Sequence, residues 1–263
     1  MEEPMAESAR KPSSEAPVPC GAGTSAQVLM APPDGTDDVL RVFYRTVRAG
    51  QERLAGGGGP FGFDVTVALL VDDLIDAYRC DAVVETGCHL GDTASYLGRR
   101  YPGLPVMTCD IDPGYARFTA HRVRDLPNVT VTCQDSPALV ADAADAFDRP
   151  LYFLDAHWGA WPLPRELAAI RTGVVLIDDF DIGHPRFGHD AYGGVSCGPD
   201  VLAAMTPPPA RYWTPVPGAE RRLPCLQVGR RAGVGLLVAG LDGRPLDDHP
   251  ALTGHALTTE EIR

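Results

Sequence analysis

The chain has 263 residues, 44% of them hydrophobic, and a formal net charge of −12 at pH 7. This length and apolar content suffice for one large α/β domain with appendages. The acidic balance argues against a nucleic-acid-binding surface, which needs clustered basic residues, and Lys11 is the only lysine. Seven cysteines without C-x-x-C spacing, the absence of an apolar run of roughly 18 residues and an acidic start predict a cytoplasmic protein without a disulfide framework.

The first third of the chain is irregular and then helical. Residues 1–36 are rich in Pro, Ser, Glu and Gly, so we expect a disordered or loosely attached segment. Apolar residues at helical spacing predict helices over 37–54 and 63–78, interrupted by Gly56–Gly59. We expect residues 37–80 to cover the substrate side of the domain that follows.

Residues 81–248 alternate between strands and helices and form the predicted cofactor-binding domain. Strands are predicted at 82–85, 106–110, 129–133, 151–155 and 174–178, and helices at 93–100, 115–126, 137–147 and 163–171. The strands are continuously apolar, as in a parallel sheet that is covered on both faces. Two late strands at 211–216 and 233–239 have no obvious helix between them, and residues 249–263 are predicted to be a polar tail. The expected fold is therefore α/β, a Rossmann-like, doubly wound, mostly parallel seven-stranded sheet with an antiparallel terminal hairpin.

The first predicted strand ends in V-V-E-T-G-C-H-L-G-D-T, residues 83–93. Glycines let a backbone approach a ligand closely, and the first turn of a helix offers free N–H groups to a negative charge. This segment therefore predicts a site for a small anionic or zwitterionic ligand, with a purely architectural turn as the alternative. Its sequence pattern, E-x-G-x-x-x-G, is similar to the first motif of class I S-adenosylmethionine (SAM) methyltransferases.

Polar residues also follow the second and third predicted strands. Asp110 stands where an acid hydrogen-bonds the ribose hydroxyls of an adenosine cofactor, although a solvated acid is the alternative. Asp112 is expected to cap the next helix. Asp135 and Ser136 are placed to receive the adenine amino group, and capping the following helix is an equally good use of either.

Three acids follow the fourth and fifth predicted strands, namely Asp155 and the pair Asp178 and Asp179. Carboxyl ends of neighbouring strands open onto one crevice, so these side chains are expected to converge. Crowded carboxylates raise one another's pKa unless a cation lies between them. Oxygen ligands with room for water or substrate suit Mg²⁺, with Mn²⁺ or Ca²⁺ as alternatives. The competing interpretation has Asp155 contacting the cofactor while the acid pair serves as caps.

The segment F-L-D-A-H-W, a helix, V-V-L-I-D-D and a Gly-His-Pro-x-Phe loop together resemble the catechol O-methyltransferase group and the macrocin-type metal-dependent sugar O-methyltransferases. The resemblance covers residues 63–187 and, more loosely, the terminal hairpin. It implies that Mg²⁺ binds to Asp155, Asp178 and Asp179. The SAM pocket is expected to be lined by Glu85, Gly87, His89, Gly91, Thr93, Asp110, Ile111, Asp135, Ser136, Asp155 and Trp158.

Two departures from this family bear on catalysis. Ala156 is inserted between the acid and His157, and Gly159 stands where the catechol enzymes carry a catalytic lysine after the tryptophan. The sugar-type enzymes are then the better analogue, and His157 is the candidate base beside Asp155. A packing role against adenine is the alternative for His157, in which case the base would be His184, His189 or Asp190.

The expected function is SAM- and Mg²⁺-dependent O-methylation of a small hydroxylated acceptor, a sugar or phenolic unit of a specialised metabolite, with residues 181–192 as an active-site lid. A metal-independent N- or C-methyltransferase on the same fold, or a cofactor-binding protein that has lost catalysis, is the alternative. Asp155-Ala156-His157 also resembles part of the manganese ureohydrolase pattern, but Gly159 replaces its next acid. We expect a small-molecule acceptor as partner, no nucleic acid and no membrane, and leave a homo-oligomer open.

Overall fold

The computed structural model describes residues 36–49, 58–157, 160–217 and 231–257. The N-terminal segment predicted to be disordered, apart from Thr36, and Trp158 therefore lie outside the described residues. None of the helices in these ranges is both long enough and apolar enough to cross a lipid bilayer.

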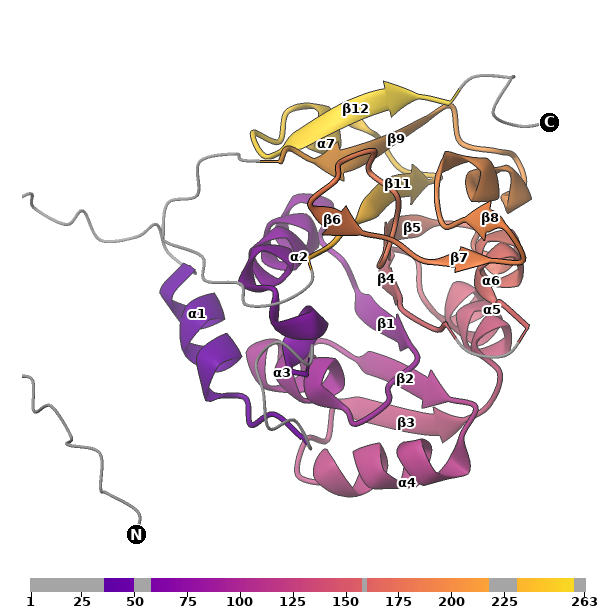
Figure 1. Cartoon of the computed structure of the whole chain (residues 1–263). Coiled ribbons are helices and arrows are strands. Elements are labelled where there is room, and N and C mark those ends of the chain that lie inside the picture. The colour runs from indigo at the N-terminus through magenta and orange to yellow at the C-terminus, as the bar shows by residue number, and fades with distance from the viewer. Residues whose placement is uncertain (1–35, 50–57, 158–159, 218–230, 258–263) are drawn as a thin grey trace, which may run out of the picture. The chain divides into compact units, whose positions relative to one another are not determined.

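An eight-stranded sheet lies at the centre, in the order β12-β9-β11-β5-β4-β1-β2-β3 (Figure 1). Five neighbouring strands are parallel: β1 (Ala82–Thr86), β2 (Val106–Asp110), β3 (Val129–Cys133), β4 (Pro150–Leu154) and β5 (Gly173–Ile177). Beyond β5, each strand is antiparallel to its neighbour: β11 (Gly235–Ala239), β9 (Arg211–Pro215) and β12 (Leu252–Ala256). The expected α/β class, with a mostly parallel sheet and an antiparallel edge, is confirmed.

The prediction of seven strands and a polar C-terminal tail is wrong in one respect. Part of that tail is β12, which pairs with β9 from Leu252 opposite Pro215 to Ala256 opposite Arg211. Of the β12 side chains only Leu252 is buried, so the strand carries almost no apolar pattern. Its pairing partner places it in the sheet, because β9 would otherwise expose unpaired backbone at the edge.

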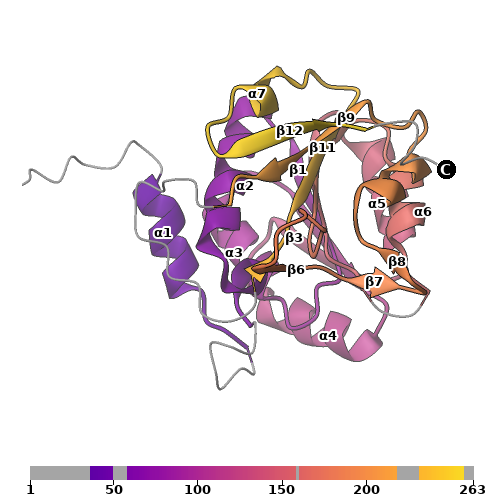
Figure 2. The same ribbon diagram turned by 45° about the horizontal axis from the view of Figure 1, so that its top comes forward.

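Helices cover both faces of the sheet (Figures 1 and 2). One apolar core joins one face to α1 (Thr36–Arg45), α2 (Val65–Tyr78), α3 (Asp92–Arg100) and α7 (Arg244–Asp247). The other core joins the opposite face to α5 (Ser136–Ala146), α6 (Leu163–Ala169) and the 3-10 helix η3 (Pro199–Ala204). Helix α4 (Pro113–Arg122) packs against β2 and β3. The sheet is thus doubly wound, as its continuously apolar strands predict.

The two predicted N-terminal helices form with different limits. Helix α1 ends at Arg45 instead of Leu54, because the next backbone groups bond elsewhere: the Val47 carbonyl accepts from Arg122, and the Ala49 N–H donates to Asp92. The 3-10 helix η2 (Pro60–Phe63) precedes α2. Helix α2 packs on a face of the sheet. The expected role of residues 37–80 in covering the substrate stays a prediction.

Short strands form the loop after β5. They are β6 (Phe187–Gly188), which pairs with β10 (Arg231–Ala232), and β7 (Ala191–Tyr192), which pairs with β8 (Val195–Ser196). These small sheets lie beside the carboxyl end of β5 (Figure 1). The strand order reverses between β1 and β4, and ligands in open α/β sheets bind at such a switch point, outside the carboxyl ends of the strands.

Candidate active site

The turn after β1 takes a backbone path that requires glycine at two positions. Gly87 has φ 77°, and a Cβ there would lie 2.7 Å from the carbonyl oxygen of Asp155. Gly91 has φ 71°, and its Cβ would lie 2.7 Å from a methyl carbon of Thr119 on α4. Only glycine combines a positive φ with such close approaches at little cost. The two glycines thus seat the turn against the end of β4 and against α4.

A cavity of about 560 Å³ lies beside this turn, at the carboxyl ends of β1, β2 and β4. This volume is within the range of small-molecule and cofactor sites. Most of the predicted cofactor residues lie along it: Gly87, His89, Asp110, Ile111, Asp135, Ser136 and Asp155, together with His157. The structure therefore brings together, in one cavity, residues that follow four different strands in the sequence.

Three predicted cofactor residues do not line the cavity. Glu85 is 2% exposed, and its Oε2 accepts a hydrogen bond of 2.6 Å from the Thr108 hydroxyl. The Thr93 hydroxyl oxygen accepts from the Phe61 N–H at 3.0 Å, and so holds the segment before α2. Gly91 packs on Thr119. In the structure these three residues contact the protein's own groups, and direct contact with a cofactor stays a prediction for each.

Asp110, at the tip of β2, has acceptor capacity to spare. Its two carboxylate oxygens accept hydrogen bonds from the His89 N–H and the Asp112 N–H, both at 2.9 Å. A carboxylate has about four lone-pair sites, so two remain for a ligand. Asp112 caps α4, as predicted, since its Oδ1 accepts from the N–H groups of Gly114 and Tyr115.

Asp135 and Ser136 lie at the start of α5. Asp135 occupies the N-cap position without a side-chain capping hydrogen bond, and its Oδ2 instead accepts from Arg165 at 2.8 Å. Ser136 is buried at the first position of the helix. Of the two uses that the sequence leaves open, capping by Asp135 does not occur.

Carboxylates from the segments that follow β4 and β5 surround the imidazole of His157. Its Nε2 lies 2.6 Å from Asp155 Oδ1 and 3.9 Å from Asp179 Oδ2. Its Nδ1 lies 3.2 Å from Asp190 Oδ2. Within the described residues, two sets of ligand atoms come within 4.8 Å of one another, Asp155–His157–Asp178 and His157–Asp179–Asp190. Both sets contain His157, and the all-aspartate set of the sequence prediction is not among them.

The acid–histidine cluster consists of His157 and the four acids Asp155, Asp178, Asp179 and Asp190. The sequence pointed to Asp190 only as an alternative base. Its N–H donates to the Asp179 carbonyl at 3.0 Å, and its carbonyl accepts from the Cys197 N–H at 2.8 Å. These bonds fold the loop back toward the end of β5. Tyr192 donates its hydroxyl to Asp190 Oδ2 at 3.2 Å, and its ring stacks on Trp161 at 5.1 Å between centroids. An aromatic pair therefore lies beside the cluster.

The charges in the cluster shift one another's pKa. Burial and the neighbouring charges of Asp155 and Asp179 raise the pKa of Asp178 well above its ordinary value. Burial lowers the pKa of His157, but the hydrogen bond to Asp155 and the surrounding carboxylate charges outweigh it and raise the pKa to about 9. The imidazole is then protonated at neutral pH. A proton-accepting His157 would need another cation to offset these carboxylates.

Glu166 of α6 is a buried acid that no motif in the sequence singles out. Its side chain is fully buried, and burial raises its pKa to about 7 against the opposing effect of the Ser136 and Thr86 hydroxyls. The only available signal was an acid on the apolar side of a predicted helix. The other candidate bases lie apart from the cluster: His184 accepts from the Arg186 N–H, and His189 lies 3.6 Å from Asp181.

Glu85→Gln should make stability less sensitive to pH. Burial raises the pKa of Glu85 from 4.5 to about 8, so the folded protein keeps a proton that the unfolded chain releases. The stability that this proton supplies is complete below pH 4.5 and is lost as the pH rises through about 8. Thermal unfolding at several pH values should show a smaller alkaline loss for Glu85→Gln than for the wild type. Asp125→Asn, at an exposed acid, is the control; equal alkaline losses in all three proteins would show that Glu85 ionises normally.

Comparison with family models and with curated proteins gives no match to this chain. Solved structures do match. Coclaurine N-methyltransferase bound to N-methylheliamine and SAH is 21% identical with a TM-score of 0.32, covering 43% of this chain and 35% of its own. Magnesium protoporphyrin IX methyltransferase from Synechocystis PCC 6803 with bound SAM is 12% identical with a TM-score of 0.42, covering 79% and 92%. Spermidine synthase from Thermotoga maritima is 14% identical with a TM-score of 0.45, covering 68% and 59%.

Proposed function

We propose that this chain is a SAM-dependent methyltransferase that acts on a hydroxyl group of a small molecule with the help of a divalent cation. The observation that carries the proposal is the juxtaposition of two features at the β1–β4 switch point. One is a cavity lined by the Gly87 turn and by Asp110, and the other is the acid–histidine cluster, which shares Asp155 and His157 with that cavity.

The residues along the cavity fit SAM by their chemistry. Asp110 would hold the ribose hydroxyls with its two remaining acceptor sites, while Ile111 offers an apolar surface to the adenine ring. Asp135 and Ser136 would meet the polar edge of adenine, and the glycine turn would hold the amino-acid end. When bound, SAM supplies a methyl group on a positively charged sulfur.

The acid–histidine cluster fits a divalent cation. Carboxylates of Asp155, Asp178, Asp179 and Asp190 are hard oxygen donors, and burial together with the charges of Asp155 and Asp179 raises the pKa of Asp178. Mg²⁺ and Mn²⁺ both accept oxygen ligands, so the carboxylates would hold either ion and leave the His157 imidazole uncoordinated. Such a cation would lower the pKa of an acceptor hydroxyl and fix its position.

The protein's own groups would orient the acceptor and take up its proton. The stacked Trp161–Tyr192 pair beside Asp190 offers a flat apolar wall, which suits a phenolic ring or the apolar face of a sugar. Asp155 and Asp190 hold the His157 imidazole from both sides and so fix its orientation. His157 belongs to the cluster and also lines the cavity. Holding the reacting groups in one orientation is a major source of rate enhancement.

Asp110→Ala should weaken SAM binding by the ~1.5–3 kcal/mol of hydrogen bonds to a charged group. Isothermal titration calorimetry with SAM measures the effect directly, and Asp125→Ala is the control because it removes an exposed acid that does not line the cofactor cavity. Unchanged affinity in a folded Asp110→Ala variant would remove Asp110 from the cofactor site.

A metal-independent methyltransferase is the second candidate, and the position of His157 favours it. The imidazole lies between Asp155 and Asp190 and already supplies one positive charge to the cluster. A screen of catechols and monosaccharides with methyl-labelled SAM, run with Mn²⁺ or with EDTA, separates the two candidates. Transfer that requires the metal supports the main proposal, and full transfer in EDTA supports the alternative.

A further inference from the structure

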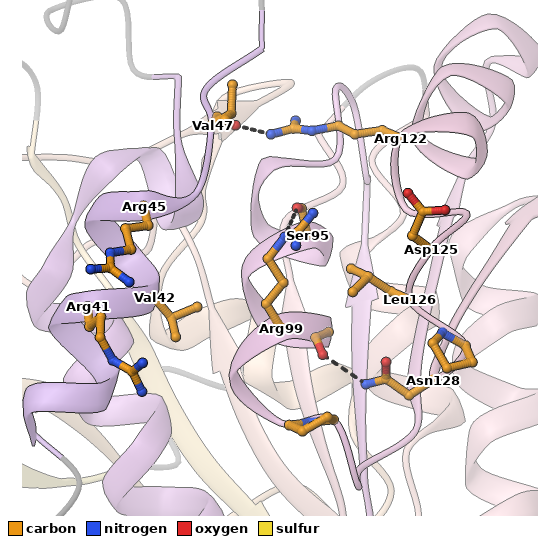
Figure 3. Close-up of a pocket in the computed structure, with 13 residues that line it drawn as sticks. Arg41, Val42, Arg45, Val47, Ser95, Arg99, Arg122, Asp125, Leu126 and Asn128 are labelled. Carbon is orange, nitrogen blue, oxygen red and sulfur yellow. Dashed lines mark hydrogen bonds between the residues drawn. The ribbon is translucent and has the colours of Figure 1, made fainter.

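A second cavity, of about 850 Å³, lies between α1, α3 and the segment that joins α4 to β3 (Figure 3). It shares no lining residue with the cofactor cavity. Four arginines line it, two from α1 (Arg41 and Arg45), one from α3 (Arg99) and one from α4 (Arg122). This concentration of positive charge stands out in a chain whose net charge is −12.

Arg122 is already engaged in holding the fold. Its guanidinium lies 2.6 Å from Asp92 and donates to the carbonyls of Leu90 and Val47. It therefore ties the glycine turn to the segment after α1, and a ligand would compete with three existing bonds for it. The ligand-binding capacity of the second cavity must come from the other arginines.

The guanidinium groups of Arg45 and Arg99 are available to bind an anionic ligand. Neither forms an ion pair with any residue of the described ranges, and Arg99 has only a long hydrogen bond of 3.4 Å to the Ser95 hydroxyl. Arg41 pairs with Asp38, but both side chains are more than half exposed, where an ion pair contributes little. Among the described residues, Asp125 is the only acid that lines this cavity, and its side chain is 82% exposed.

The segment that joins α4 to β3 forms a rigid wall of the cavity with an apolar part. Leu126 and Pro127 line the cavity from this segment, and Val42 lines it from α1. Asn128 donates its amide to the carbonyls of Gly98, Tyr101 and Leu104, at 3.2, 3.0 and 3.1 Å, and so locks this wall to the end of α3. A ligand that fills the cavity needs an anionic group for the arginines and an apolar body for this wall.

We infer that the second cavity binds a small organic phosphate, with the phosphate at Arg45, Arg99 and Arg41 and the organic part against Leu126 and Pro127. A phosphate group carries about −1.5 to −2 charges and matches the fork of a guanidinium, so it offsets several arginines where one carboxylate would leave most of them unpaired. The volume is much larger than inorganic phosphate needs and falls within the range of small-molecule sites. This inference does not depend on the proposed methyltransferase activity.

The test is calorimetry of the full chain with three probes that share one ring system: 1-naphthyl phosphate, 1-naphthoate and 1-naphthol. The wild type should bind the phosphate at least about tenfold more tightly than the other two, a difference of about 1.4 kcal/mol. Arg45→Gln/Arg99→Gln should weaken that binding at least about tenfold, since each removed arginine takes away a charge-assisted bond. Arg171→Gln, which removes an exposed charge on another part of the surface, should leave it unchanged.

Several results would overturn the inference. They are equal affinity for the phosphate and the naphthoate, equal affinity of the double variant and the wild type, and no binding of the phosphate at about 10 mM, far above the range of specific sites.

Loss of naphthyl phosphate binding in Asp110→Ala would place the probe in the cofactor cavity instead. Arginine-dependent binding of a glutamate-rich peptide without binding of naphthyl phosphate would make this surface a protein-docking site. Because Arg45 and Arg99 are exposed, thermal unfolding of the double variant should match the wild type.

Discussion

Substituting Asp178 by asparagine should weaken Mn²⁺ binding by more than the roughly 10–100-fold that loss of a supporting residue costs, and should abolish most methyl transfer. The amide keeps the shape of the side chain but removes the charge that the proposed cation would neutralise. Asp178 does not line the cofactor cavity, so SAM affinity should change little. Metal binding is measured by calorimetry with Mn²⁺, and transfer with the acceptor that gives the highest turnover in the screen.

Asp181→Asn is the matched control for this experiment. Asp181 belongs to the same loop, but its carboxylate accepts from the Gly183 N–H and lies near His189 outside the acid–histidine cluster. It should retain both metal binding and turnover. Asp178→Asn with wild-type Mn²⁺ affinity and wild-type turnover would show that the acids after β5 serve only the fold, and would favour the metal-independent candidate.

Substituting His157 by glutamine should reduce turnover at saturating SAM by the about 10²–10⁴-fold of a lost acid–base group. Glutamine retains much of the size and one hydrogen bond, but it can neither carry nor release a proton near neutral pH. The imidazole also connects Asp155 with Asp190, so its loss should disturb the orientation of both acids. Single-turnover kinetics with labelled SAM, together with calorimetry for SAM, separate chemistry from cofactor binding.

His189→Gln provides the comparison, because His189 belongs to the loop after β5 but lies apart from the cluster. It should keep its turnover within a small factor of the wild type. If His157→Gln instead weakens SAM binding and keeps its turnover at saturating SAM, His157 is a packing residue of the cofactor cavity. The proton acceptor would then have to be sought at Asp190.

The parallel half of the sheet could be predicted from the sequence almost to the residue. Strands β2 and β3 have the predicted limits, because each is a short run between clear turn signals. The terminal hairpin could also be predicted from the sequence, since β9 and β11 carry buried runs such as Tyr212–Trp213. Strand β12 could not be predicted, because it is held in the sheet by pairing with β9 and has no apolar pattern of its own.

The cofactor cavity was more predictable than the cluster beside it. Asp110 ends β2, and Gly87 and Asp155 directly follow β1 and β4, so the parallel topology alone brings them together. Asp190 comes from a loop whose course depends on backbone bonds to Asp179 and Cys197, which no local pattern encodes. The central position of His157 likewise depends on side-chain geometry, so the sequence predicted a ring of acids without the imidazole between them.

The proposed function requires that the cavity at the ends of β1, β2 and β4 bind SAM. Its most direct test is calorimetry of the full wild-type chain with SAH, the demethylated product, in the absence of any acceptor. We expect binding at one site with a dissociation constant of about 1–100 μM, and loss of most of that affinity in Asp110→Ala. Absence of SAH binding by the folded wild-type protein would show that this cavity is not a SAM site.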